Sequence, residues 1–332
     1  MKYEHCVRNP ALSLQRETKN GEGMKNDKDI RVNLYRVKGD AAPFVLVDYM
    51  DKDAQEHTGV MLLDSGCMGN ILSNEMAECI GPLCKIEEEG TKLYSIAHEV
   101  MEAENVNFSF ALGGTQFHEK FCITPKEMPI RIKGIQVVGI LGLRFMQKHG
   151  LVIDYSDFSC HTSDVNPQNL SISDCDFFFP MEPGLKGYGL PVLAFTQGNK
   201  DIVVLADTGA TNNMIAEPTI VENNFSCMRT NEKDVMDGIT GSVEVEEAIV
   251  KFTLLSVTEN DVKEISCHSN FYLSPDYIFV PSKDYCNGDI EGLPPVEALI
   301  GSPFMARQGW VLDFGAEIIY KRRTEQVLKE AV

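Results

Sequence analysis

The chain has 332 residues and a formal charge of −19, with 43% hydrophobic and 24% charged residues. This length favours two compact units, and the composition is that of a globular protein. The negative charge argues against a nucleic-acid partner, since phosphate binding requires clustered Lys and Arg. No stretch approaches the roughly 20 apolar residues of a membrane-spanning helix, so we expect no membrane contact.

Cysteine usage bears on the compartment and on metal binding. The ten cysteines are scattered without a C-x-x-C pair, which favours reduced thiols in the cytoplasm over a disulfide framework. Cys160-His161 and Cys267-His268 are adjacent pairs, and no second pair stands at metal-ligand spacing. We therefore expect a cytoplasmic protein without a metal ion or a cofactor.

Short β-type runs succeed one another along the first half of the chain. Residues 43–47, PFVLV, predict a strand that turns back into the apolar run 60–72, VMLLDSGCMGNIL. Alternating apolar residues predict a half-buried strand at Val106-Phe108-Phe110. Residues 140–155, ILGLRFMQKHGLVIDY, predict a buried strand, a short helix and a second strand.

The second half repeats this order. Residues 203–215, VVLADTGATNNMI, match 60–72 at a spacing of 143 residues, and Val250-Phe252-Leu254 predicts a second alternating strand. Residues 299–314, LIGSPFMARQGWVLDF, match 140–155 at a spacing of 159 residues, with six identical positions. The change in spacing implies about 16 additional residues, which we place between Ser256 and Pro294.

This duplication predicts the domain organisation. Residues 1–30 are polar and form an N-terminal extension, and the Ser-, Asp-, Pro- and Gly-rich residues 166–188 form a connector. The two β-rich units are therefore residues 31–165 and 189–332. We expect an all-β protein with two lobes related by a pseudo-twofold axis.

Each apolar run breaks at an aspartate, Asp64 in the first half and Asp207 in the second. In a two-fold arrangement the same residue of each half meets at the axis, so the two carboxyl groups are expected to face one another. Two carboxylates about 3 Å apart share one proton. Such a pair can activate a water molecule and polarise a carbonyl group, and its titration belongs to the pair.

The residues after the two aspartates suit this arrangement. Ser65 and Thr208 supply hydroxyl groups that can hydrogen-bond across the axis and brace the turns. Gly66 and Gly209 permit close approach of the backbone. The alternative without a function is a pair of unrelated turns with solvated carboxylates, but duplication of the whole pattern argues against it.

These motifs resemble two successive units of the retropepsin-like aspartic protease family. The resemblance rests on LLDSGCMGNIL with ILGLRFMQKHGLVIDY, and on LADTGATNNMI with LIGSPFMARQGWVLDF, and it covers residues near 43–155 and 190–320. It implies catalytic roles for Asp64 and Asp207 in a cleft between two β-barrel lobes. It also implies that 93–100 and 236–243 are hairpin flaps. The flap residues expected to contact substrate are Ile96, Gly238, Ile239 and Gly241.

The leading hypothesis is an aspartic endopeptidase that hydrolyses peptides or proteins as a monomer, with both halves of its site in one chain. A second hypothesis keeps the fold without the chemistry, as a catalytically silent peptide-binding or scaffold protein. Two retained acids count against it, because a binding module does not need them. In a third arrangement each unit pairs with a unit of another chain, so that the active particle is a dimer or larger.

Overall fold

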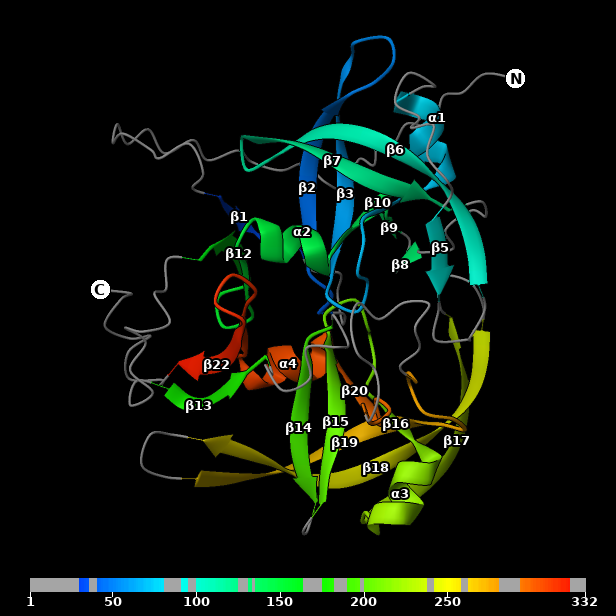
Figure 1. The fold of residues 1–332 in the computed structure, drawn as a ribbon, viewed down its shortest axis with the longest axis vertical. Coiled ribbons are helices and arrows are strands. Elements are labelled where there is room, and N and C mark those ends of the chain that lie inside the picture. Colours follow the sequence, from blue (N-terminus) through cyan, green and yellow to red (C-terminus); the bar gives the residue numbers. More distant parts are fainter. Residues whose placement is uncertain are drawn as a thin grey trace.

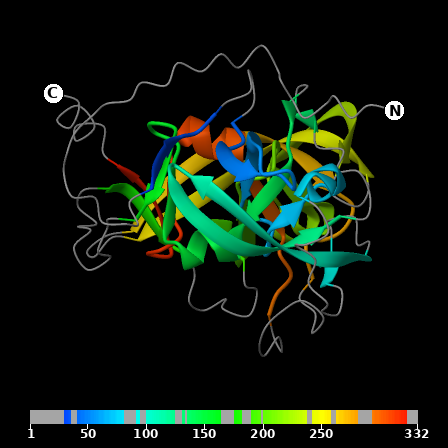
Figure 2. The same cartoon turned by 90° about the horizontal axis from the view of Figure 1, so that it is seen from above.

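The computed structural model describes residues 30–35, 41–80, 91–94, 100–124, 131–132, 135–163, 175–181, 190–197, 200–237, 242–257, 262–280 and 293–322. Strands dominate these ranges and the helices are short, so the fold is mostly β, as the sequence predicts. Two large sheets lie toward opposite ends of the long axis, with α2 (Leu143–Lys148) and α4 (Ser302–Gln308) between them (Figure 1). Viewed from above, the first-half strands overlie those of the second half (Figure 2).

The two large sheets have seven described strands each and the same order. The first runs β2 (Phe44–Met50), β3 (Glu56–Asp64), β10 (Gly139–Gly142), β4 (Ile71–Leu72), β7 (Thr115–Ile123), β6 (Val100–Leu112) and β5 (Thr91–Tyr94). The second runs β14 (Val192–Gln197), β15 (Lys200–Asp207), β20 (Ala298–Gly301), β16 (Met214–Ala216), β19 (Val262–Ser274), β18 (Ser242–Val257) and β17 (Cys227–Asp237). The repeat in the sequence is therefore a repeat in strand topology.

The strand that ends in an aspartate has the same neighbours in each half. β3 runs parallel to β10, which places Asp64 opposite Gly142. β15 runs parallel to β20, which places Asp207 opposite Gly301. β10 and β20 are buried throughout, and β3 and β15 are buried toward their C-terminal ends, which explains the apolar residues that precede each aspartate.

A third sheet joins the two halves. Its six described strands run β1 (Arg31–Asn33), β12 (Ser159–Thr162), β11 (Leu151–Asp154), β21 (Val311–Asp313), β22 (Ile318–Arg322) and β13 (Cys175–Pro180). At its centre β11 is antiparallel to β21, with Val152 opposite Asp313 and Asp154 opposite Val311. Equivalent residues thus exchange partners, as a local two-fold axis requires.

The short helices pack on the sheets through repeated aromatic contacts. Phe145 of α2 lies with its ring centroid 5.8 Å from that of Phe110, and Phe304 of α4 lies 5.9 Å from Phe252. All four rings are buried and belong to one apolar cluster with members from both halves. The other helices of the described residues are α1 (Asn74–Ile80) and α3 (Glu217–Asn223), which follow β4 and β16. No helix in the described ranges has the length and apolarity needed to cross a membrane.

The structure refines three sequence predictions. The alternation is confirmed, because Val106, Phe108, Phe110, Val250 and Phe252 are all buried, while the side chain of Leu254 lies outside the described set. The expected connector contains a strand, β13, which pairs with β22. The run Phe177-Phe178-Phe179 has strong β propensity and accounts for this strand. Part of the second-half insertion extends the β18–β19 hairpin, whose strands have 16 and 13 residues against 13 and 9 in β6 and β7.

Two short strands complete the described elements. β8 (Arg131–Ile132) and β9 (Ile135–Gln136) form a separate antiparallel pair. The expected N-terminal extension, residues 1–30, lies outside the described residues except for Ile30, which is buried. Thr162 binds Ile30 through both its hydroxyl and its backbone N–H, so the described chain begins attached to β12.

Candidate active site

Asp64 and Asp207 lie at the ends of β3 and β15, where each strand leaves its sheet in a tight turn. The Oδ1 atom of Asp64 accepts the backbone N–H of Gly66 at 2.8 Å and that of Cys67 at 3.1 Å. The Oδ1 atom of Asp207 accepts the N–H of Gly209 at 2.9 Å and the next N–H, of Ala210, at 3.2 Å. Each turn therefore holds its carboxylate in the same orientation through short local bonds.

The structure brings these two carboxyl groups into direct hydrogen-bond contact with each other. Both residues remain partly exposed, whereas the neighbouring Ser65 and Thr208 are fully buried. The pair is thus bonded at its base and accessible on one side. This is the geometry that a carboxylate pair needs to meet a ligand from solvent.

Ser65 and Thr208 cross-link the two turns by reciprocal bonds. The Ser65 N–H donates to Thr208 Oγ1 at 2.9 Å, and the Thr208 N–H donates to Ser65 Oγ at 2.9 Å. The Thr208 hydroxyl then donates to the Leu63 carbonyl at 2.8 Å, and the Ser65 hydroxyl to the Ala206 carbonyl at 2.7 Å. Each hydroxyl is both donor and acceptor, so a residue with a hydroxyl group is needed at each of these positions.

Gly66 and Gly209 leave room for the carboxyl group of the opposite half. A Cβ atom on Gly66 would lie 2.4 Å from Asp207 Oδ2, and one on Gly209 would lie 2.4 Å from Asp64 Cγ. Both distances are shorter than any stable non-bonded contact. Glycine is therefore required here by the close approach of the two halves.

The pKa of each carboxyl group is raised above its ordinary value. Burial is the largest cause for Asp64, and the charge and hydrogen bond of Asp207 raise that pKa further, well above the usual range. Burial also raises the pKa of Asp207, but the hydrogen bond from Asp64 and several backbone N–H groups oppose the rise. The two groups consequently hold one proton between them over a range of pH.

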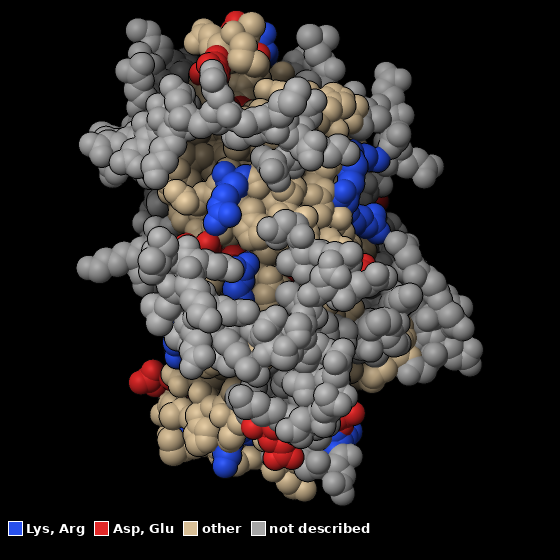
Figure 3. All heavy atoms as spheres, turned by 90° about the vertical axis from the view of Figure 1, so that its left-hand side faces the viewer, with Lys and Arg blue, Asp and Glu red and all other residues tan. Residues whose placement is uncertain are grey.

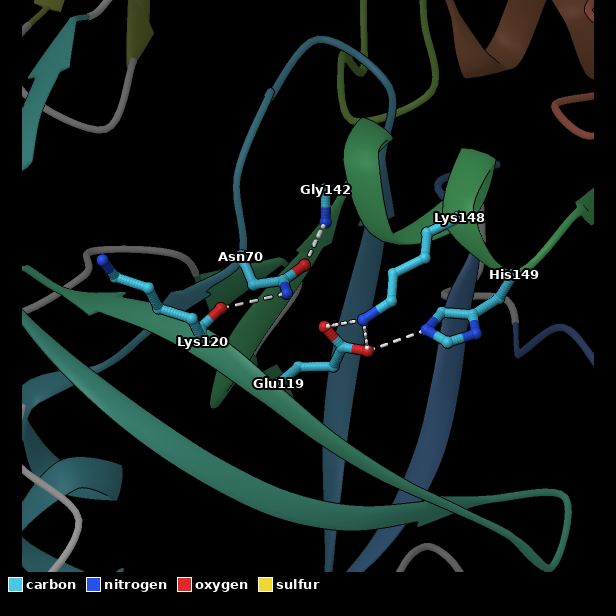
Figure 4. Close-up of polar contacts among 6 residues, drawn as sticks. All are labelled: Asn70, Glu119, Lys120, Gly142, Lys148 and His149. Atoms are coloured by element: carbon cyan, nitrogen blue, oxygen red, sulfur yellow. Dashed lines mark hydrogen bonds and ion pairs between the residues drawn. The ribbon is translucent and has the colours of Figure 1, made fainter.

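Two buried asparagines support the turns, although sequence reasoning assigned them no role. Asn70 Oδ1 accepts the N–H of Gly142 at 3.0 Å, and Asn213 Oδ1 accepts the N–H of Gly301 at 3.0 Å. The amide of Asn70 also donates to the Lys120 carbonyl at 3.2 Å (Figure 4). The signal for this role was present, because both asparagines occupy the same position of the repeat.

A charged cluster in the first half links α2 to β7. Glu119 binds Lys148 Nζ at 2.7 Å and His149 Nε2 at 2.8 Å (Figure 4). The His149 ring also packs 4.8 Å from the ring of Phe117 and 4.7 Å from that of Phe145, between centroids. Burial raises the pKa of Glu119, but the bonds from Lys148 and His149 outweigh it and leave the pKa below its usual value.

The expected flap residues Ile96, Gly238, Ile239 and Gly241 lie outside the described residues. The strands that lead to them are described. β5 and β6 are antiparallel with Tyr94 opposite Val100, and β17 and β18 are antiparallel with Asp237 opposite Ser242. Both segments are thus the arms of hairpins.

Features that would favour other kinds of site are limited in the described part of the chain. No group of three or more His, Cys, Asp or Glu side chains there is arranged to hold a metal ion. On the face shown in Figure 3, Lys and Arg side chains lie at separate places rather than in one continuous patch.

Comparisons with known proteins did not identify the chain. Neither the models of known protein families nor the curated proteins contain a match to it.

Proposed function

We propose that the protein is an aspartic endopeptidase with a bilobal fold of the pepsin and retropepsin type. Each half forms one β-barrel lobe, and Asp64 and Asp207 are the catalytic residues. The observation that carries this proposal is the hydrogen-bonded pair of partly exposed carboxyl groups, held by the reciprocal hydroxyl bonds of Ser65 and Thr208. Two equivalent turns that meet in this way have no need for paired acids unless the acids act together.

In this mechanism a water molecule bound between the carboxyl groups attacks the carbonyl carbon of the peptide bond. The ionised aspartate accepts a proton from the water, and the protonated aspartate donates its proton to the carbonyl oxygen. The C–N bond of the resulting tetrahedral intermediate then breaks as the nitrogen takes a proton. No covalent bond forms between the protein and its substrate, so the two aspartates contribute proton transfer alone.

The substrate in this proposal is a peptide or protein segment bound in a cleft between the lobes. The β5–β6 and β17–β18 hairpins support it, because each extends from a sheet whose Asp-bearing strand ends at the dyad. In this proposal the residues that would cover the substrate are Ile96, Gly238, Ile239 and Gly241, which follow β5 or β17 in the sequence. Closure over the substrate would exclude water other than the attacking molecule.

We propose that the active particle is a monomer with an internal pseudo-dimer. The support is the β11–β21 pairing and the bonds between Ser65 and Thr208, which join the halves of one chain. A covalent connection also removes the concentration dependence of pairing. We place the protein in the cytoplasm, because its ten cysteines are scattered without a C-x-x-C pair, a usage that favours reduced thiols.

The test is cleavage of a diverse peptide library from pH 3 to pH 8 by the full chain and by the Asp64→Asn and Asp207→Asn variants. We expect cleavage by the parent chain and a loss of at least about 10³-fold in each variant, since each removes a proton-transfer group. Asp157→Asn is the matched control, because this aspartate is half-exposed and its ion pair within the described residues is with Arg31 at 3.6 Å.

A second measurement separates catalysis from binding. Statine-type peptides carry a hydroxyl group that mimics the tetrahedral intermediate, and we expect them to bind more tightly than matched substrates. Tight peptide binding with no cleavage by the parent chain would overturn the enzyme and identify a catalytically silent binding protein. Equal cleavage by the parent chain and both Asn variants would show that the dyad does not carry the activity.

A further inference from the structure

A buried chain of hydrogen bonds runs behind Asp207 from the first half of the protein to the second. The Tyr155 hydroxyl lies 2.8 Å from Ser302 Oγ, and Ser302 Oγ donates to the carbonyl oxygen of Thr208. Because Ser302 has a single hydroxyl proton and a carbonyl only accepts, the Tyr155 hydroxyl is the donor to Ser302. Tyr155 is 2% exposed, and Ser302 and Thr208 are 0% exposed, so water does not compete for these bonds.

This chain reaches Asp207 through one peptide group. The Thr208 carbonyl and the Gly209 N–H belong to the same amide, and the Gly209 N–H donates to Asp207 Oδ1 at 2.9 Å. A hydrogen bond accepted by the carbonyl polarises the amide and makes its N–H a stronger donor. The Tyr155 and Ser302 hydroxyls therefore stabilise the charged form of Asp207 without touching it.

The turn that holds Asp64 has no counterpart of this chain. In the repeat, Leu143 occupies the position of Ser302, and Phe314 occupies that of Tyr155. Neither side chain can donate a hydrogen bond. Each carboxyl group accepts two backbone N–H bonds from its own turn, so the Tyr155–Ser302 chain is what distinguishes the surroundings of the two turns.

We propose that Tyr155 and Ser302 are positioning residues that make Asp207 the ionised member of the pair and leave the shared proton on Asp64. This assignment rests on the proposed function for its chemical meaning. Asp207 is then the base that accepts the proton of the attacking water, and Asp64 is the acid that protonates the carbonyl oxygen. When the C–N bond breaks, Asp207 passes its proton to the nitrogen and Asp64 recovers one from the diol, so the starting state returns.

A further titratable group, the thiol of Cys67, faces the pair. Cys67 lies in the turn after Asp64, and its thiol donates to the Gly69 carbonyl at 3.1 Å. Burial, and then the charge of Asp64, raise the pKa of this thiol well above its usual value. Cys67 thus stays neutral through the acidic range in which the two aspartates titrate.

The test is a site-resolved titration of the full chain labelled with ¹³C at its aspartate carboxyl groups and followed by NMR. Asp64→Asn and Asp207→Asn assign the two resonances. In the parent chain we expect the Asp207 resonance to report the lower apparent pKa of the pair. In Tyr155→Phe and Ser302→Ala this lower pKa should rise by roughly 0.2–0.6 pH unit, because the Gly209 N–H becomes a weaker donor.

Matched variants separate this effect from general damage. Tyr155→Phe introduces the residue that the other half carries at Phe314, and it decides the outcome if Ser302→Ala does not fold. Tyr49→Phe changes another buried tyrosine, on β2, and should leave both resonances in place. An unchanged lower pKa in folded Tyr155→Phe, or a parent chain in which Asp64 titrates first, would overturn the assignment.

The titration requires no turnover, so the two proposals fail separately. Absence of cleavage with the expected titration would overturn the protease and leave the charge assignment intact. Cleavage by the parent chain together with an unchanged titration in the variants would support the protease and overturn the charge assignment. Where cleavage is observed, the acid limb of its pH profile should shift upward with the lower pKa.

Discussion

Replacing Thr208 by Val keeps the volume of a fully buried side chain but removes its two hydrogen bonds between the halves. The Ser65 N–H, in a residue that is 0% exposed, loses its acceptor at 2.9 Å, and the Leu63 carbonyl loses a donor at 2.8 Å. A buried donor without a partner costs about 1–3 kcal/mol, and a lost bond about 0.5–1.5 kcal/mol. We expect the free energy of unfolding to fall by about 2–4 kcal/mol.

The assay is urea unfolding of the full chain followed by tryptophan fluorescence, since the single tryptophan, Trp310, is 0% exposed and reports unfolding of the core. Thr58→Val is the matched control, because Thr58 is exposed on β3 and its hydroxyl donates to the Asp48 side chain. The control should change the unfolding free energy by less than about 0.5 kcal/mol. A Thr208→Val variant as stable as this control would refute the cross-bracing role.

Three further changes test other contacts. Gly209→Ala should destabilise the protein by about 1–3 kcal/mol and weaken binding of statine-type peptides, because its Cβ would collide with the Asp64 carboxyl group. Gly69→Ala is its control, with no atom within 4 Å of the added carbon, and equal effects of the two would contradict the argument. Glu119 has a lowered pKa in the folded state, so it stabilises the protein above its ordinary value of 4.5 and loses this contribution as the pH falls. Glu119→Gln should therefore lower the unfolding free energy at pH 7 by about 0.5–1 kcal/mol, and the difference should vanish on acidification; a constant difference would point to packing instead. Glu297, 5% exposed, has a pKa raised by burial, so its contribution is present at low pH and lost as the pH rises through the folded-state value. Melting temperatures should show Glu297→Gln gaining stability relative to the parent chain between pH 4.5 and pH 8, and a relative loss would refute this sign.

The meeting of Asp64 and Asp207 could be predicted because a duplicated sequence carries geometric information that a single motif does not. The two Asp-bearing runs occupy equivalent positions of the repeat, so they were expected to form equivalent strands. Two-fold packing of equivalent strands brings their ends together. The short helices α2 and α4 were also predictable, since a buried strand followed by apolar residues at helical spacing and a glycine has few other solutions. Asn70 and Asn213 also occupy equivalent positions of the repeat, but this pattern alone did not indicate what the two asparagines do.

The features that could not be predicted arise where the halves differ. Ser302 aligns with Leu143, and nothing in either neighbourhood indicates that its hydroxyl would meet Tyr155, 147 residues away. β13 was hidden because its residues are surrounded by turn-forming ones, and its pairing with β22 depends on a long-range contact. The predictions depended on matching residues of one half with those of the other, so they could not extend to positions where the two halves differ.

The interleaved third sheet has a consequence for how the chain could be divided. β13 lies in the expected connector, before the second unit begins, yet it pairs along its length with β22 near the end of that unit. A single cut between Met181 and Leu190 would therefore leave each fragment holding a strand that the other needs. Such fragments are expected to co-assemble without a linker, so mixing the two should restore the folded protein to an extent that rises with their concentration.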